Sequence, residues 1–174
     1  PLIVSLANTK EVLYMINRPG QSASHRGSVE WIDRAVELVA PVAGTVTIRG
    51  DTDFTHTAHL DRWDQAGRRF ILGMDAHAKV VGLAEALPAS AWQRLERLPK
   101  YDILTEPRQK AFRYKEQIVV EKEFRNQILV GEDIAEIDYQ PVKCDRKYRL
   151  VIVRKNISVQ KGEKALLDEV RYFF

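Results

Sequence analysis

Over the first forty residues, the pattern of apolar and polar positions changes from strand-like runs to a helical spacing. Residues 2–7 and 11–16 are apolar, β-branched runs on either side of a polar stretch, which predicts a β-hairpin. The loop-forming sequence NRPGQSASHRGS follows, and residues 27–40 then place an apolar residue every three or four positions. This spacing predicts a helix with one apolar stripe, capped by Ser28 and ended before Pro41.

A strand–helix–strand pattern continues from residue 45. The β-branched run at residues 45–50 predicts a strand buried on both faces. Residues 55–67 read as a helix with Thr55 as its cap and Gly67 as its stop, and residues 69–74 read as the next strand. Connections of this length favour right-handed crossovers and parallel pairing. We therefore expect an α/β fold in which a hairpin and parallel strands form one mixed sheet with flanking helices.

The pattern changes near residue 76. Residues 77–87 and 89–98 predict two short helices separated by Pro88, and strand-like runs follow at residues 117–124, 127–130, 134–139, 148–154 and 171–174. The second half is thus expected to be an α-to-β insertion with its own antiparallel sheet. We divide the chain into residues 1–76, part of a core domain, and residues 77–174, the insertion subdomain.

Composition adds few constraints. The 174 residues carry a net charge of +3, with a sequence pI near 9.0, which permits nucleic acid as a partner without arguing for it. The single cysteine, Cys144, excludes an internal disulfide framework and suits a reducing compartment. No apolar run approaches the length of a membrane span. The apolar stretches at both ends, PLIVSLA and RYFF, lead us to expect a fragment of a longer protein.

The stretch TIRGDTDF raises a specific question, because an apolar strand ends there on two aspartates, Asp51 and Asp53. Turn chemistry explains an aspartate at such a position, and spacing alone favours that explanation. Asp53, which precedes the predicted helix, fits an N-terminal capping role. The alternative is that the carboxylates hold a cation, since residues two apart on a strand share a face.

Three stretches together resemble a known family. They are PLIVSLANTKEVLYMINRPG, RGDTDFTHTAHLDRWDQAGRRFILGMDA and YRLVIVRKNISVQKGEKALLDEVRYFF, which span nearly the whole chain in order. They are similar to the DDE-type transposases of bacterial insertion sequences, which have a ribonuclease-H-like core with a β-rich insertion. The resemblance implies a partial ribonuclease-H-like mixed sheet over residues 1–76. It also implies three catalytic acids, of which only the second, Asp51, falls in this chain.

The resemblance carries further expectations. Asp51 would be catalytic and a ligand of Mg²⁺ or Mn²⁺, with Asp53 as a weaker second ligand. The first acid would lie upstream of Pro1 and the third beyond Phe174, so the fragment alone would be inactive and would bind metal weakly. The partners would be double-stranded DNA, as transposon ends and target, and a second copy in a synaptic dimer. The location would be the bacterial cytoplasm, on the nucleoid.

Basic side chains supply the DNA-binding candidates, although charge runs are usually solvated surfaces. The candidates are Arg18, Arg26, Arg49, Arg113, Lys115, Lys147 and Arg149. The aromatic residues Tyr101, Phe112, Tyr114 and Tyr148 lie among the later ones and could stack on distorted DNA, but packing of the small sheet is the simpler interpretation. His56 and His59 could share a helix face as metal ligands, but no further ligand completes a set.

Two other functions remain open at this stage. The chain could be a non-catalytic DNA-binding remnant of a mobile element, which would lack the flanking Asp and Glu. It could also belong to a ribonuclease-H-like nuclease that cuts DNA without joining strands.

Overall fold

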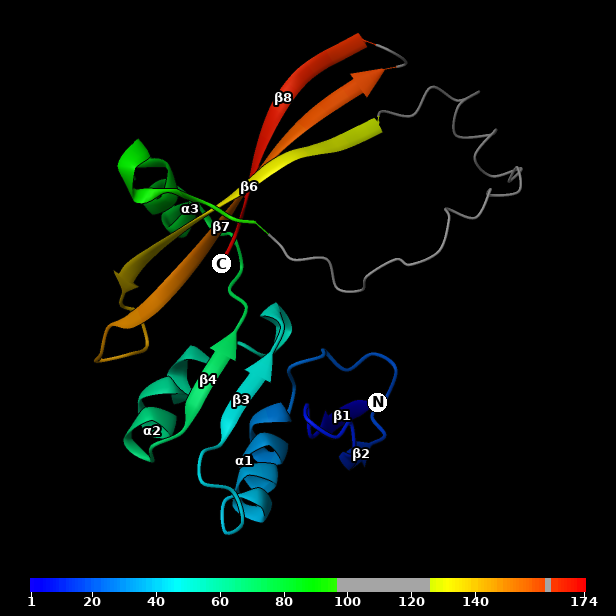
Figure 1. Ribbon diagram of the computed structural model, residues 1–174. Coiled ribbons are helices and arrows are strands. Elements are labelled where there is room, and N and C mark those ends of the chain that lie inside the picture. The colour runs from blue at the N-terminus through cyan, green and yellow to red at the C-terminus, as the bar shows by residue number, and fades with distance from the viewer. Residues whose placement is uncertain (97–125, 162–163) are drawn as a thin grey trace, which may run out of the picture. The chain divides into compact units, whose positions relative to one another are not determined.

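The computed structural model describes residues 1–96, 126–161 and 164–174 (Figure 1). The chain forms two compact units. The first contains Pro1–Asp75 and Asp138–Leu150, and the second contains Ala76–Ile137 and Val151–Phe174. Residues 138–150 thus lie with the first unit, although the sequence pattern placed them in the insertion. The expected strand at residues 117–124 lies outside the described residues, as do Tyr101, Phe112, Arg113, Tyr114 and Lys115.

The first unit begins with the expected hairpin. Strands β1 (Leu2–Ser5) and β2 (Val12–Ile16) pair antiparallel, with Leu2 opposite Ile16 and a register shift after Val4. Because side chains alternate between faces, Leu2 is buried while Ile3 is exposed. The prediction of a hairpin is confirmed.

Helix α1 (Ser28–Val39) follows the loop, as its apolar stripe predicted. The prediction that Ser28 caps this helix is wrong, because Ser28 is the first helical residue. The N-cap is Gly27, which has the left-handed conformation at φ 71°. The glycine is favoured there because a side chain is strained at positive φ. The hydroxyl of Ser28 is thereby free for a different contact, described below.

Strands β3 (Thr47–Gly50) and β4 (Arg69–Leu72) pair in parallel, as predicted, with Ile48 opposite Phe70. Two expectations fail here. Strand β3 is not buried on both faces, because Ile48 is buried while Thr47 and Arg49 are exposed. Nor do the hairpin and the parallel pair form one mixed sheet, since β1–β2 and β3–β4 are separate two-stranded sheets.

The predicted helix at residues 55–67 is shorter and starts later. Two 3₁₀ turns, η1 (Thr52–Phe54) and η2 (Thr57–His59), precede helix α2 (Leu60–Gln65). Thr55 caps no α-helix and instead donates its hydroxyl to the carbonyl of Gly73. The stop is confirmed, because Gly67 follows the helix with φ 69°.

The core of the first unit forms between these elements and residues 138–150. Ile48, Leu60, Trp63 and Cys144 are buried together, and partly buried side chains of α1, β3–β4 and Tyr148 pack around them. Trp63 donates its indole N–H to Asp33 on α1 at 2.8 Å, which ties α2 to α1. Apolar burial of this kind is the main favourable term in folding.

The described part of the second unit contains one α-helix and a four-stranded sheet in the order β5–β6–β7–β8. Helix α3 (Ala78–Glu85) appears as predicted and buries Val80 and Ala84. The helix expected at residues 89–98 is absent from its described part, where a 3₁₀ turn, η3 (Ala89–Ala91), leads into strand β5 (Gln93–Arg94). A short propensity signal is easily overridden by pairing with a neighbouring strand.

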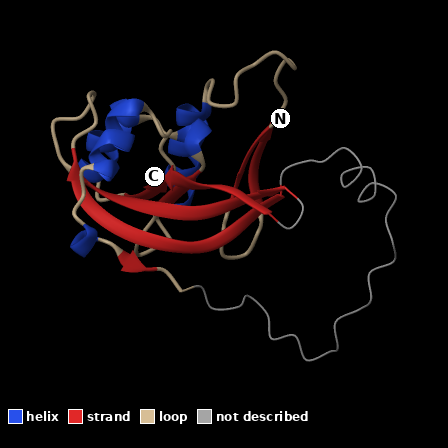
Figure 2. Cartoon of the chain, turned by 90° about the horizontal axis from the view of Figure 1, so that it is seen from above, coloured by secondary structure: helices blue, strands red, loops and turns tan. Residues whose placement is uncertain are grey.

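The long strands of the second sheet are curved along their length (Figure 1; Figure 2). β6 (Asn126–Tyr139) joins two runs that the sequence pattern separated, while β7 (Tyr148–Lys161) and β8 (Lys164–Phe173) extend well past the predicted runs. β7 and β8 are antiparallel, as expected, and β5 pairs antiparallel with β6. Among the described residues, no helix is long and apolar enough to cross a membrane.

Candidate functional site

Asp51 lies directly after β3, at the carboxyl end of the parallel pair. Its side chain is exposed, and its Oδ1 accepts the backbone N–H of Asp53 at 3.1 Å. This contact makes Asp51 the N-cap of η1, so the capping role expected of Asp53 belongs to Asp51. The bond orients the carboxylate and leaves Oδ2 and further lone pairs available to a ligand.

Glycines on both strands keep the backbone beside Asp51 closely packed. A Cβ at Gly50 would lie 3.0 Å from Cβ of Phe54, and one at Gly73 would lie 3.1 Å from the backbone nitrogen of Thr52. Any larger residue at either position would push the η1 turn away from the strands. The close approach of η1 to the two strands therefore depends on these two glycines.

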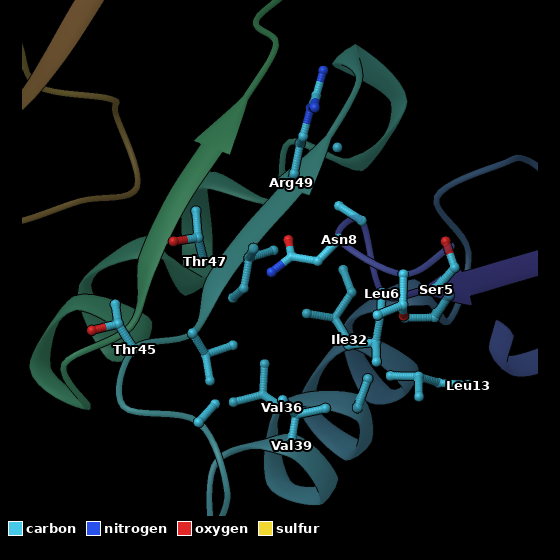
Figure 3. Close-up of a pocket in the computed structure, with 18 of the residues that line it drawn as sticks. Ser5, Leu6, Asn8, Leu13, Ile32, Val36, Val39, Thr45, Thr47 and Arg49 are labelled. Carbon is cyan, nitrogen blue, oxygen red and sulfur yellow. The ribbon is translucent and has the colours of Figure 1, made fainter. Parts of the chain in front are cut away.

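A groove with a cavity volume of about 920 Å³ runs alongside β3 and ends at Asp51. Its floor is the apolar stripe of α1, including Ile32, Val36 and Val39 (Figure 3). One wall is formed by residues 4–9, which contain the end of β1, and the other by residues 45–51.

Each wall of the groove contains residues of one strand, Val4 and Ser5 of β1 and Thr47–Gly50 of β3. Among the described residues, β1 pairs only with β2 and β3 pairs only with β4, which leaves each with one unpaired edge. Unpaired strand edges present backbone N–H and C=O groups that can pair with another strand. The groove therefore combines two such walls with an apolar floor.

The basic candidates in the first fifty residues have different surroundings. Arg18 donates from Nη1 to the carbonyls of Ser24 and Arg26, both at 2.9 Å, so its guanidinium organises the loop before α1. Arg26 accepts the Arg18 hydrogen bond through its backbone carbonyl, and the side chain of Arg26 is exposed. Arg49 lies on β3 with an exposed side chain (Figure 3).

The later basic candidates lie around Tyr148. Lys147 and Arg149 flank it and are exposed. Tyr148 itself packs its ring edge-on against Phe70, with centroids 5.2 Å apart, and donates its hydroxyl to Asp61. This aromatic residue is thus held in the core of the first unit and is not presented to a nucleic acid base.

Residues 144–148 are fastened to α2 by several contacts that sequence reasoning missed. Asp61 accepts the Tyr148 hydroxyl and also the backbone N–H of Asp145 at 2.6 Å, and Arg146 pairs with Asp64. The Tyr148 hydrogen bond is the largest cause that lowers the pKa of Asp61. The Cys144 thiol donates to the carbonyl of Thr57 at 3.1 Å, and burial raises its pKa.

A second missed group links α1 to the turn after Asp51. The Ser28 hydroxyl, 1% exposed, lies 2.7 Å from the carbonyl of His25 and 2.6 Å from Nε2 of His56. The rings of His25 and His59 each lie 6.2 Å from that of His56. Neither His56 nor His59 lies in an α-helix, so the shared helix face proposed for them is wrong.

Asp51 and Asp53 are the carboxylates of this unit that the sequence offers as metal ligands. Within the described residues, no group of three or more His, Cys, Asp or Glu side chains could hold a metal ion. Asp51 offers one exposed, oriented carboxylate, which is the ligand type that Mg²⁺ prefers. Mg²⁺ usually keeps several waters and binds one or two carboxylates, so Asp51 fits one member of a shared ligand set.

Comparisons with known proteins give no assignment. No family model matches the chain, and neither the curated proteins nor the solved structures contain a match to it.

Proposed function

We propose that the chain is part of a DDE-type DNA transposase, in which Asp51 is one of three acids that bind divalent metal. The observation that carries this proposal is the place of Asp51, exposed at the carboxyl end of β3 and at the end of the groove. Ligands of open α/β sheets bind outside the carboxyl ends of the strands. A carboxylate fixed there by a backbone N–H is suited to holding a metal ion.

The groove supports the proposal in a second way. The resemblance expects a strand with the first acid immediately before Pro1, and the groove offers two free strand edges with an apolar floor. A strand that paired with the free edges of both β1 and β3 would join the two small sheets into one, because strand edges pair through their backbone N–H and C=O groups. The carboxyl end of such a strand, if parallel to β3, would lie beside Asp51.

The residues of this chain would act as follows. Asp51 would contribute one oxygen ligand, and Arg49, exposed on the same strand, would contact a DNA phosphate. Divalent metal would stabilise the charge that builds up on the phosphoryl oxygens during in-line displacement. Arg18 would act indirectly, because its guanidinium fixes the loop before α1.

The test is Mg²⁺-dependent nicking of DNA that carries the element's ends, by the full-length protein. Asp51→Asn keeps the shape of the side chain but removes its charge, and it should reduce cleavage at least about 100-fold, since metal stabilisation is worth several kcal/mol. Glu37→Gln is the matched control, because it removes the charge of an exposed carboxylate on α1 that is not a proposed metal ligand, and it should change the rate less than about threefold.

Full cleavage by Asp51→Asn would remove this residue from the mechanism. Absence of Mg²⁺-dependent cleavage by the wild-type protein would favour a non-catalytic DNA-binding remnant. Equal losses in the Asp51 and control variants would count against a specific role for Asp51.

A further inference from the structure

His56 connects the turn that follows Asp51 to the first residue of α1. Its imidazole lies between η1 and η2, and its Nε2 is 2.6 Å from the buried hydroxyl of Ser28. The geometry points to His56 as a positioning residue, which acts through Ser28 to hold the η1 turn and the carboxylate of Asp51 in place. The importance of this role for catalysis rests on the proposed function, but the role itself does not.

The direction of the hydrogen bonds follows from the donors available. A serine hydroxyl has one hydrogen, and its 2.7 Å contact with the carbonyl of His25 uses it. The Ser28 oxygen must then accept from His56, so Nε2 of His56 carries a proton. At 1% exposure, Ser28 cannot replace this partner with bulk water, and losing it would leave a buried acceptor unsatisfied.

The turn held by His56 has little else to fix it. Backbone bonds within it are short-range ones, from Phe54 N–H to Asp51, Thr55 N–H to Thr52 and His56 N–H to Phe54, at 3.1, 3.3 and 3.0 Å, besides the bond from Asp53 N–H to the Asp51 carboxylate. Hydrogen bonds of single 3₁₀ turns have poorer geometry than those of an α-helix, so they stabilise the turn less. Two side-chain contacts hold its later part, from Thr55 to the carbonyl of Gly73 and from Cys144 to the carbonyl of Thr57. His56 lies between these two contacts in the sequence, and its bond to Ser28 ties the turn to α1.

The surroundings of His56 make this anchor sensitive to pH. The titratable groups that face its ring are the imidazoles of His25, in the loop before α1, and His59, in η2. Burial is the largest cause that lowers the pKa of His56, followed by the charges of His59 and His25. The folded state therefore disfavours a charged His56. The imidazolium keeps its Nε2 proton and its bond to Ser28, but the closed turn loses stability relative to the open one as pH falls below the ordinary imidazole pKa of about 6.5.

The experiment is amide hydrogen exchange measured by NMR between pH 5.5 and 8, corrected for the intrinsic exchange rate. It needs neither metal nor DNA, so it can succeed even if the transposase proposal fails. In the wild-type chain, the protection of the Asp53, Phe54 and Thr55 amides should decrease as the pH is lowered. His56→Ala should reduce it about tenfold at pH 7.5, as should Ser28→Ala.

His56→Gln separates positioning from simple packing, because its amide can donate to Ser28 but does not titrate. This variant should keep the protection of the turn and lose its pH dependence. His77→Ala, an exposed histidine in the second unit, is the control and should change nothing.

Three outcomes would overturn the inference. Protection that survives in His56→Ala would show that the anchor is unnecessary. A wild-type pH dependence in His56→Gln would assign the titration to another group. Loss of protection spread equally through α1, including Ala40, would make His56 a general stability residue without a positioning role.

Discussion

Ile48 and Ile71 test the packing of the first unit, because they lie on paired strands with opposite surroundings. Ile48 on β3 is 6% exposed and belongs to the core with Leu60 and Trp63. Ile71 on β4 is 66% exposed. Replacing each with alanine removes the same atoms from the same type of element, so the difference between them measures burial.

The expected cost follows from the atoms lost. Ile→Ala removes three methylene equivalents, and at about 0.8 kcal/mol each this lowers the free energy of unfolding by about 2.4 kcal/mol when they are buried. The cavity left behind brings the expected total for Ile48→Ala to about 3 kcal/mol. Ile71→Ala should change stability by less than about 0.5 kcal/mol, as exposed substitutions usually do.

Urea unfolding followed by tryptophan fluorescence provides the assay, since Trp31 and Trp63 both lie in the first unit. With a slope of about 1–1.5 kcal/mol/M, the Ile48→Ala midpoint should fall by roughly 2–3 M. If that variant does not fold, Ile48→Val should still cost about 1 kcal/mol. Equal effects at positions 48 and 71, with an unchanged slope, would refute the assignment of Ile48 to the core.

Two further predictions concern the hydrogen bond between Tyr148 and Asp61 and two glycines. Tyr148→Phe should raise the pKa of Asp61, followed by ¹³C NMR of its carboxylate, because the hydroxyl is the largest cause that lowers it. A carboxyl with a lowered folded pKa stabilises the protein above its unfolded pKa of about 3.9, so the variant should lose stability at pH 7 and show a shallower loss on acidification. Gly67→Ala should cost about 1 kcal/mol in urea unfolding, because φ there is 69°, whereas Gly82→Ala in α3, with open space around it, should stabilise by about 0.5–1 kcal/mol. An unchanged Asp61 pKa, or the same sign for both glycine variants, would contradict these arguments.

The sequence by itself determined the elements that local patterns specify. The hairpin, α1, α3 and the parallel pairing of β3 with β4 follow from hydrophobic period, turn residues and connection length. The stop at Gly67 follows from the freedom of glycine to adopt positive φ. These features depend on residues close together in the chain, so one sequence is enough to predict them.

Only the tertiary structure decided the features that join distant segments. The separation of the two small sheets, the alternating burial of β3, the Ser28–His56 bond and the docking of Tyr148 on Asp61 each depend on contacts between segments far apart in sequence. Serine, histidine and tyrosine have many partners of suitable chemistry in any chain, and packing selects one of them. The sequence therefore offers Asp51 as a candidate, while the bond from Asp53 N–H to its carboxylate and the Ser28–His56 bond come only from the structure.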